Sequence, residues 1–181
     1  DKRLLYKANF CCRTALRILV SLRRFRAATD KELYQNLTYF KWNRYIHPEG
    51  TIAVSSVVNQ APAFNNSLYV AQRVKDAICD QLRAKTGRRP SVDLTKPDVR
   101  INIHIYETKA TISLDSSEEP LYRRGYRGAA GEAPLSESLA AGIICLTEWD
   151  GKSAFVDPMC GSGTFPVEAA KVLGVTEGTA T

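Results

Sequence analysis

Histidine is nearly absent from this chain of 181 residues, which holds only His47 and His104. The five cysteines form no Cys-x-x-Cys pair, so a zinc site built on paired cysteines or a redox-active dithiol lacks its spacing. Their odd number and scattered positions indicate reduced thiols. Because His47 stands beside Pro48 in a turn and His104 lies on the polar side of an alternating segment, the sequence predicts no metal site.

Long apolar runs are also missing. No run approaches the roughly 20 residues that a transmembrane helix needs. The first residues are rich in Lys and Arg but lack the uninterrupted apolar segment of a signal peptide. The composition is otherwise globular, with 44% hydrophobic and 24% charged residues. We therefore expect a soluble, cytoplasmic protein of one or two domains that does not contact membranes.

Acidic residues are scarce in the first half of the chain. Residues 1–90 carry 17 Lys or Arg and 6 Asp or Glu, a net charge of +11, whereas residues 91–181 carry 8 and 13, a net charge of −5. Contacts from Lys and Arg to phosphate supply most sequence-independent affinity for nucleic acid. The asymmetry thus suggests a nucleic-acid-binding part joined to a part with another task, although a solvated basic surface is the alternative.

Apolar spacing predicts the elements of the first part of the chain. We expect a strand over residues 4–10, a helix from Thr14 to about residue 26, and a second helix from Asp30, as N-cap, to about residue 40. The outward positions of the helix from Thr14 hold a set of arginines: Arg13, Arg17, Arg23, Arg24 and Arg26. This face is the first candidate basic patch.

A β-branched run predicts a strand over residues 51–58, and one apolar stripe predicts a helix over residues 67–85 that ends at Gly87. Alternation over residues 99–106 and a run over 111–114 predict a hairpin. The outer face of the long helix and its exit carry the densest basic cluster: Arg73, Lys75, Arg83, Lys85, Arg88 and Arg89. We expect these residues to bind nucleic acid.

A second candidate site follows the composition shift at residues 115–120. Arg123, Arg124 and Arg127 are interleaved with Tyr122 and Tyr126, and such mixtures of cations and aromatic rings occur in nucleic-acid and anion sites. An ordinary surface loop is the alternative. A helix is predicted from about residue 136 to 149.

The chemically most specific stretch is Asp157-Pro158-Met159-Cys160-Gly161-Ser162-Gly163-Thr164. A short apolar run over 154–156 predicts a strand before it, and Thr164 is a good N-cap for a helix after it. The two glycines let the backbone approach a ligand and point N–H groups at an anion. A tight turn without a ligand is the alternative.

The anion is not identified by the usual nucleotide motifs. A phosphate loop of the GxxxxGK[ST] type needs a lysine where Thr164 stands, and a dinucleotide GxGxxG needs a glycine where Pro166 stands. Cys160 could be taken for a nucleophile, but neither histidine has a sequence relation to it. The turn itself resembles motif I of the class I S-adenosylmethionine-dependent methyltransferases.

Further strings lie in one order along the chain: Ser113-Leu114-Asp115-Ser116-Ser117, Arg124-Gly125-Tyr126-Arg127, Ala133-Pro134-Leu135, Leu139-Ala140-Ala141 and Glu168-Ala169-Ala170. With the glycine turn, they make the chain resemble the THUMP-domain RNA methyltransferases. It is most similar to the bacterial members that methylate N2 of a guanine in 23S ribosomal RNA.

The resemblance implies an α+β chain in two parts. Residues 1–117 would be the RNA-binding region, with a partial ferredoxin-like module at about 1–58 and a THUMP core at 59–117. Residues 118–181 would contain the first strand and helix of a Rossmann-type methyltransferase domain. The amides of the loop Asp157 to Thr164 would hold the methionine carboxylate of S-adenosylmethionine, and structured RNA, most of all 23S ribosomal RNA, would be the partner.

The sequence departs from the family pattern in three places. Phe165-Pro166 stands where aliphatic residues are usual, and Glu177 is no convincing counterpart of the acidic residue that holds the cofactor ribose. The catalytic Asn/Asp-Pro-Pro-Tyr/Phe element does not occur in these residues. We therefore expect a fragment with no catalytic residue of its own and no methyltransferase activity alone.

Two other functions remain open. A stand-alone RNA-binding module with a vestigial Rossmann piece is the first, and a tRNA guanine-N2 methyltransferase is the second, because THUMP domains also serve tRNA-modifying proteins. An Asn-Pro-Pro-Tyr-type motif encoded in frame after residue 181 would favour the enzyme over the binding module.

Overall fold

In a computed structural model of the protein, the structure describes residues 1–125 and 135–172. The chain divides into two compact units. One unit is Leu19–Glu118, and the other combines Asp1–Ile18 with the chain from Glu119. None of the described helices is long and apolar enough to cross a lipid bilayer.

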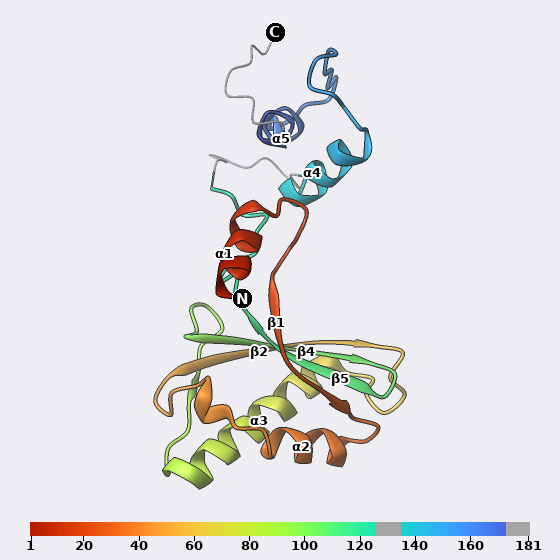
Figure 1. The fold of residues 1–181 in the computed structure, drawn as a ribbon. Coiled ribbons are helices and arrows are strands. Elements are labelled where there is room, and N and C mark those ends of the chain that lie inside the picture. The colour runs from red at the N-terminus through yellow and green to blue at the C-terminus, as the bar shows by residue number, and fades with distance from the viewer. Residues whose placement is uncertain (126–134, 173–181) are drawn as a thin grey trace. The chain divides into compact units, whose positions relative to one another are not determined.

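The unit Leu19–Glu118 is a mixed sheet with two helices on one face (Figure 1). Its elements are β1 (Leu19–Arg26), α2 (Asp30–Thr38), the 3₁₀ helix η1 (Trp42–Arg44), β2 (Thr51–Asn59), α3 (Ser67–Thr86), β3 (Ser91–Val92), β4 (Val99–Tyr106) and β5 (Lys109–Asp115). The strand order is β1-β5-β4-β2-β3. Strand β2 runs parallel to β3 and β4, whereas β5 is antiparallel to both β4 and β1. The predicted α+β class is confirmed.

Alternation in β4 separates the two faces of this sheet. Ile101, Ile103 and Ile105 are at most 1% exposed, whereas His104 and Tyr106 on the other face are exposed. The buried isoleucines belong to the same core as the apolar stripe of α3: Val70, Val74, Ala77, Ile78 and Leu82. Burial of each large aliphatic side chain contributes about 1.5–3 kcal/mol, so this layer stabilises the unit.

The ends of α3 follow from two residues. The side chain of Asn66 accepts a hydrogen bond from the N–H of Tyr69 at 3.2 Å and caps the first turn. Gly87 ends the helix in the left-handed region with φ +71°, where a residue without a Cβ is favoured. The predicted long helix and its glycine stop are confirmed. The second helix, α2, is also present, with Thr29 rather than Asp30 as its N-cap.

The predicted helix from Thr14 to about residue 26 is wrong. Residues 14–18 belong to the other unit, and Leu19–Arg26 form β1, which pairs with β5 along its whole length. A bulge between Ser21 and Arg23 shifts the alternation, so the strand has no clean two-residue period. Because β1 is an edge strand, its arginines also protect the sheet from pairing with another chain.

The other unit contains three described helices, α1 (Lys2–Cys11), α4 (Glu137–Leu146) and α5 (Thr164–Val172). The strand predicted over residues 4–10 is therefore wrong. Asp1 caps α1 by accepting the N–H of Arg3 at 3.0 Å, and none of the residues of this helix is buried. The strand predicted over 154–156 is not formed among the described residues, because no neighbouring strand is present there to pair with it.

Candidate functional site

The glycine turn lies directly before α5 and has the left-handed backbone that its glycines permit. Gly161 has φ +52° and Gly163 has φ +73°. The N–H of Gly163 donates to the carbonyl of Cys160 at 2.8 Å, and the carbonyl of Gly163 accepts the N–H of Val167 at 3.1 Å. Helix α5 thus begins directly after the turn, and its N-terminal end faces the loop.

Several polar groups of this loop are left without a partner. The N–H groups of Gly161 and Ser162 donate to no acceptor in the part of the chain that the structure describes. A Cβ added at Gly163 would meet no atom within 4 Å, so the space in front of it is open. Asp157 accepts the N–H of Met159 at 3.2 Å through Oδ1. Its Oδ2 is buried and has no hydrogen-bond partner within the described ranges.

The remaining loop residues differ in exposure. Pro158, Met159 and Cys160 are exposed, and Met159 is 88% exposed. Thr164 is buried, and its hydroxyl lies 3.3 Å from that of Ser162. The loop therefore presents unpaired donors, a buried unpaired acceptor and an open space, which together fit a ligand that carries both an anionic group and a hydrogen-bond donor.

The helix that carries the loop is held by a buried ion pair. Glu168 of α5 is fully buried and pairs with Arg124, whose side chain is 13% exposed, and with Arg13 at 3.9 Å. Arg124 also donates to the backbone carbonyl of Arg13. Arg124, which the sequence places in a nucleic-acid cluster, thus ties α5 to the N-terminal segment. Arg123 beside it is exposed, and Arg127 lies outside the described residues.

Three of the six cations in the cluster of α3 and its exit are engaged in ion pairs. The Nε of Arg73 contacts both carboxylate oxygens of Asp30 at 3.0 Å, and its guanidinium lies 4.1 Å from the ring of Tyr34. Lys75 pairs with the neighbouring Asp76, and Arg88 pairs with Glu49. Arg83, Lys85 and Arg89 are exposed and hold no ion pair within residues 1–125 and 135–172.

The acidic residues beside this cluster also affect a tyrosine. The hydroxyl of Tyr34 donates to Asp80 at 2.5 Å. This hydrogen bond, followed by burial, raises the pKa of Tyr34 above its usual value. The helix surface around Arg73 is therefore a mixed network of charges, which makes it less uniformly cationic than the sequence alone indicates.

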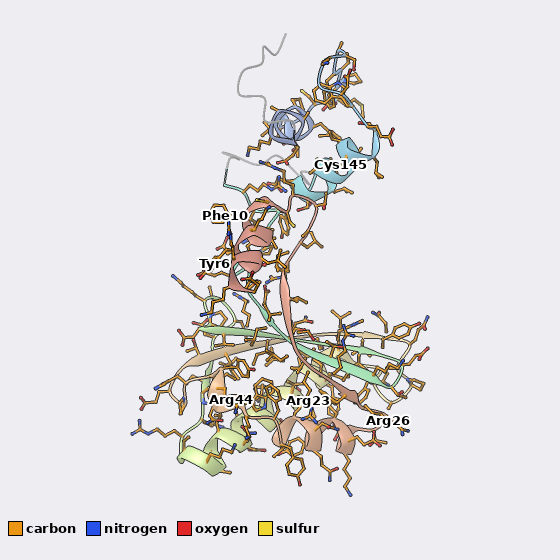
Figure 2. All side chains as sticks on the ribbon, in the orientation of Figure 1. Tyr6, Phe10, Arg23, Arg26, Arg44 and Cys145 are labelled. Atoms are coloured by element: carbon orange, nitrogen blue, oxygen red, sulfur yellow. The ribbon has the colours of Figure 1, made fainter. Side chains whose placement is uncertain are left out.

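Sequence reasoning missed one pocket in the unit Leu19–Glu118. The pocket, which we call the cation–aromatic pocket, has a volume of about 290 Å³ and is lined by Arg23, Tyr39, Phe40, Lys41, Arg44 and Tyr45. Figure 2 shows Arg23 and Arg44 on the side of the sheet that carries α2 and α3. One sequence signal could have found it: the segment between Glu32 and Glu49 contains no Asp or Glu.

Two family models match the chain. The model of the THUMP domain matches residues 27–115, and that of the RMKL-like methyltransferase domain matches residues 124–176. A relative in Methylococcus capsulatus, named ribosomal RNA large subunit methyltransferase K/L, is 45% identical over 169 residues. The match covers 91% of this chain and 23% of that relative.

Solved structures share the fold over nearly the whole chain. A structure from Clostridium difficile 630, described as a possible methylase, aligns with a TM-score of 0.80 and 34% identity, and covers 95% of this chain and 45% of its own. The structure of SMU.472 in complex with SAH aligns with a TM-score of 0.77 and 31% identity, with the same coverage. The chain spans less than half the length of each of these proteins.

The THUMP match falls within the unit Leu19–Glu118, and the RMKL-like match includes the glycine turn and α5. The chain therefore combines a THUMP domain at residues 27–115 with a segment of an RMKL-like methyltransferase domain at residues 124–176.

Proposed function

We propose that this chain supplies the RNA-binding unit and the cofactor loop of an S-adenosylmethionine-dependent methyltransferase that acts on guanine N2 of 23S ribosomal RNA. The THUMP match and the 45% identity to a ribosomal RNA large subunit methyltransferase support this proposal. Residues 1–117 would bind RNA and residues 118–181 would begin the cofactor domain. A cytoplasmic location belongs to the same proposal, since bacterial ribosomal RNA is located in the cytoplasm.

The glycine loop is the observation that carries the proposal. The methionine end of S-adenosylmethionine has a carboxylate beside an ammonium group. The free N–H groups of Gly161 and Ser162 suit the carboxylate, and the buried Oδ2 of Asp157, which has no partner within the described ranges, suits the ammonium. A buried acceptor without a donor costs about 1–3 kcal/mol, which a bound ligand would recover. The relative solved with SAH is consistent with this cofactor.

The full proposed cofactor site is the loop itself: Asp157, Pro158, Met159, Cys160, Gly161, Ser162, Gly163 and Thr164. The cofactor supplies an electrophilic methyl group when bound. The residues of this chain bind and orient its methionine end, and α5 keeps the loop in place through the Glu168 ion pair. Transfer to an exocyclic amine depends mainly on alignment, so strong acid–base groups are not needed here.

The proposed RNA-binding residues fall into two classes. Arg83, Lys85 and Arg89 can meet phosphate directly because they hold no ion pair in the described part of the chain. Arg73, Lys75, Arg88 and Arg124 would first have to exchange a carboxylate for phosphate. Arg123 is exposed and belongs to the proposal, as does Arg127.

Binding of residues 1–181 to two RNAs tests the RNA part of the proposal. We expect tighter binding to a fragment of 23S ribosomal RNA than to tRNA, and a steep loss of affinity with salt, because each neutralised phosphate contributes a slope of about −0.9 on duplex DNA and about −0.7 on single strands. Filter binding at two salt concentrations measures both.

The double variant Arg88→Ala/Arg89→Ala should bind less tightly, whereas Arg3→Ala/Lys7→Ala, which removes two exposed charges from α1, should not. Salt-insensitive affinity, or equal affinity of both double variants, would contradict the proposal. Tighter binding to tRNA than to the 23S fragment would indicate a tRNA substrate in place of 23S ribosomal RNA.

A further inference from the structure

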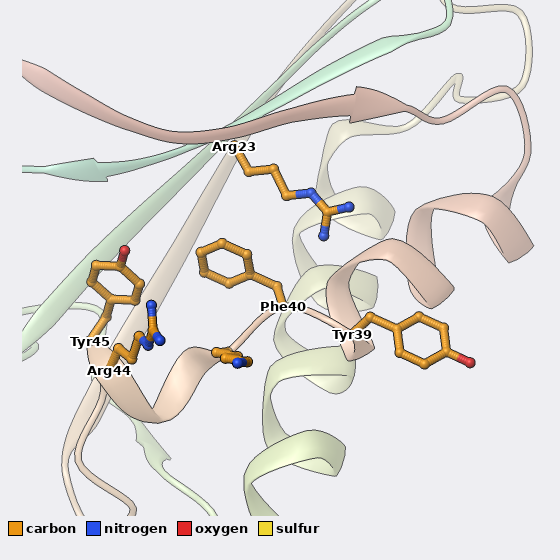
Figure 3. Close-up of a pocket in the computed structure, with 6 residues that line it drawn as sticks. Arg23, Tyr39, Phe40, Arg44 and Tyr45 are labelled. Atoms are coloured by element: carbon orange, nitrogen blue, oxygen red, sulfur yellow. The ribbon is translucent and has the colours of Figure 1, made fainter.

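The cation–aromatic pocket lies within the unit Leu19–Glu118 and combines three cations with three aromatic rings. Figure 3 shows Arg23 reaching from β1 toward Phe40, while Arg44 and Tyr45 come from η1 and its end. The rings of Phe40 and Tyr45 are stacked, with centroids 5.8 Å apart and an interplanar angle of 11°. Tyr39 at the end of α2 is 82% exposed. The pocket is therefore an open, flat-walled site with positive charge around it.

Buried residues beneath the pocket fix its wall. Trp42 is fully buried, its Nε1 donates to the carbonyl of Leu37 at 2.8 Å, and its ring lies 4.7 Å from that of Phe40. The buried side chain of Gln81 accepts the N–H of Trp42 at 3.2 Å and donates to the carbonyl of Thr38 at 2.7 Å. The segment that carries the aromatic rings is thus held before any ligand arrives, which lowers the cost of ordering on binding.

The charge of the pocket is not compensated. Arg23, Lys41 and Arg44 are all exposed, and none has a carboxylate within ion-pair distance in residues 1–125 and 135–172. No Asp or Glu lines the pocket. By contrast, Arg73 and Arg88 of the α3 cluster already hold carboxylates. An anion that enters the pocket displaces no existing ion pair, which in the α3 cluster is true only of Arg83, Lys85 and Arg89.

We propose that the cation–aromatic pocket binds one unpaired nucleotide of an RNA, with the base on the ring wall of Phe40 and Tyr45 and the flanking phosphates near Arg23 and Arg44. The inference rests on the proposed RNA-binding function and deepens it. A base offers a flat face to an aromatic ring whatever its sequence, and arginine neutralises phosphate beside it. This combination of neighbouring rings and cations matches a nucleotide better than a simple anion.

The pocket discriminates between paired and unpaired nucleotides. Both faces of a base within a duplex are covered by its neighbours, so the base cannot reach the rings without leaving its stack. The structure therefore predicts that RNA with an unpaired extension binds more tightly than the same helix with a blunt end.

The test compares two RNA hairpins that differ only in a short unpaired 3′ extension. Binding to residues 1–181 is followed by fluorescence anisotropy. We expect the wild-type protein to bind the extended hairpin about tenfold more tightly, the gain expected for one stacked base. Arg23→Ala/Arg44→Ala should lose most of this preference and keep its affinity for the blunt hairpin.

The matched control is Arg24→Ala/Arg26→Ala. This variant removes the same charge as Arg23→Ala/Arg44→Ala, and both of its arginines lie in β1 with Arg23. Their register with Thr111 and Lys109 puts them on the other face of the sheet from Arg23. The control should keep the preference for the extended hairpin. Tyr45→Leu should lose it and Tyr45→Phe should keep it, which separates stacking from a general loss of fold.

Three results would overturn the inference. If both arginine double variants lose the preference for the extended hairpin equally, the preference comes from net charge. If Tyr45→Leu keeps that preference, Tyr45 does not stack on the base. Tight binding of the blunt hairpin with no gain from the extension would show that the protein binds RNA but does not use the pocket. If neither hairpin binds, the proposed RNA-binding function fails as well, so the two failures are distinguishable.

Discussion

At the scale of single residues, the glycine turn gives the sharpest prediction. Gly163→Ala places a Cβ in open space but at φ +73°, so the cost is backbone strain of about 1–3 kcal/mol and not a clash. In a chimera that joins residues 1–181 to the remaining part of the Methylococcus relative, the dissociation constant for S-adenosylmethionine should rise about tenfold to a hundredfold. RNA affinity should stay nearly unchanged. Titration calorimetry and RNA binding on one variant measure both.

Gly87→Ala is the control for this prediction. Gly87 has nearly the same φ, +71°, and the same open surroundings, but it ends α3 in the other unit. The control should lose a similar amount of stability and keep its affinity for S-adenosylmethionine. Parallel loss of cofactor and RNA affinity in Gly163→Ala would mean that the glycine serves only the turn.

A second prediction concerns two neighbouring arginines with different roles. Arg124→Ala removes a cation that pairs with the fully buried carboxylate of Glu168, so the free energy of unfolding should fall by about 2–3 kcal/mol. Arg123→Ala removes an exposed side chain and should change it by less than about 0.5 kcal/mol. Urea unfolding of both variants measures the difference, and equal stability would contradict the structural role of Arg124.

These residues also show how far a sequence can be interpreted one residue at a time. The glycines at 161 and 163 are predicted because only a residue without a Cβ adopts their backbone freely. The role of Arg124 could not be predicted, since its partner Glu168 is 44 positions away and the sequence does not show that the carboxylate is buried. A cluster of cations and rings predicts a binding surface, but the sequence does not show which of its members already have partners.

At the scale of elements, a clamp joins the starts of two parallel strands. Asp98, just before β4, accepts both the N–H of Thr51 in β2 at 2.7 Å and its hydroxyl at 3.0 Å. The N–H of Asp98 in turn donates to the hydroxyl of Thr51 at 2.9 Å. The backbone hydrogen bond from Thr51, and then the one from its hydroxyl, lower the pKa of Asp98.

The clamp makes stability depend on pH. Because the pKa of Asp98 is lower in the folded state, its contribution is present above the unfolded pKa of about 3.9 and is lost as the pH falls through the folded pKa. The urea midpoint should therefore fall less between about pH 5 and about pH 3 in Asp98→Asn than in the wild type. Asp76→Asn, which removes a carboxylate paired with its neighbour Lys75, is the control and should follow the wild type. Identical acid dependence of Asp98→Asn and the wild type would contradict the clamp.

Helices and strands could be predicted where their buried apolar residues recur at a regular spacing. The helix α3 and the hairpin of β4 and β5 follow this rule, because their apolar residues repeat at 3.6 and 2 positions without interruption. Strand β1 was missed because the bulge after Ser21 interrupts its alternation and leaves leucines at helical spacing. Helix α1 was missed because it buries none of its residues, so its sequence carries no core stripe.

At the scale of the whole molecule, one chain contains both the sheet unit that we propose to bind RNA and the loop that we propose to bind S-adenosylmethionine. The THUMP and RMKL-like matches give the order of these parts. The pocket could not be predicted from the sequence, because Arg23 lies in β1 and Arg44 in η1, and the sequence does not show that these two elements meet.

The most direct test is methyl transfer by the chimera with labelled S-adenosylmethionine and 23S ribosomal RNA, followed by nucleoside analysis. Residues 1–181 alone serve as the control and should transfer no methyl group, since the Asn/Asp-Pro-Pro-Tyr/Phe element that we expect to hold the target amine does not occur among them. We expect label in N2-methylguanosine of the ribosomal RNA, abolished in the chimera by Asp157→Ala/Gly163→Ala. Transfer by residues 1–181 alone, label on tRNA only, or label on an atom other than guanine N2 would contradict the account.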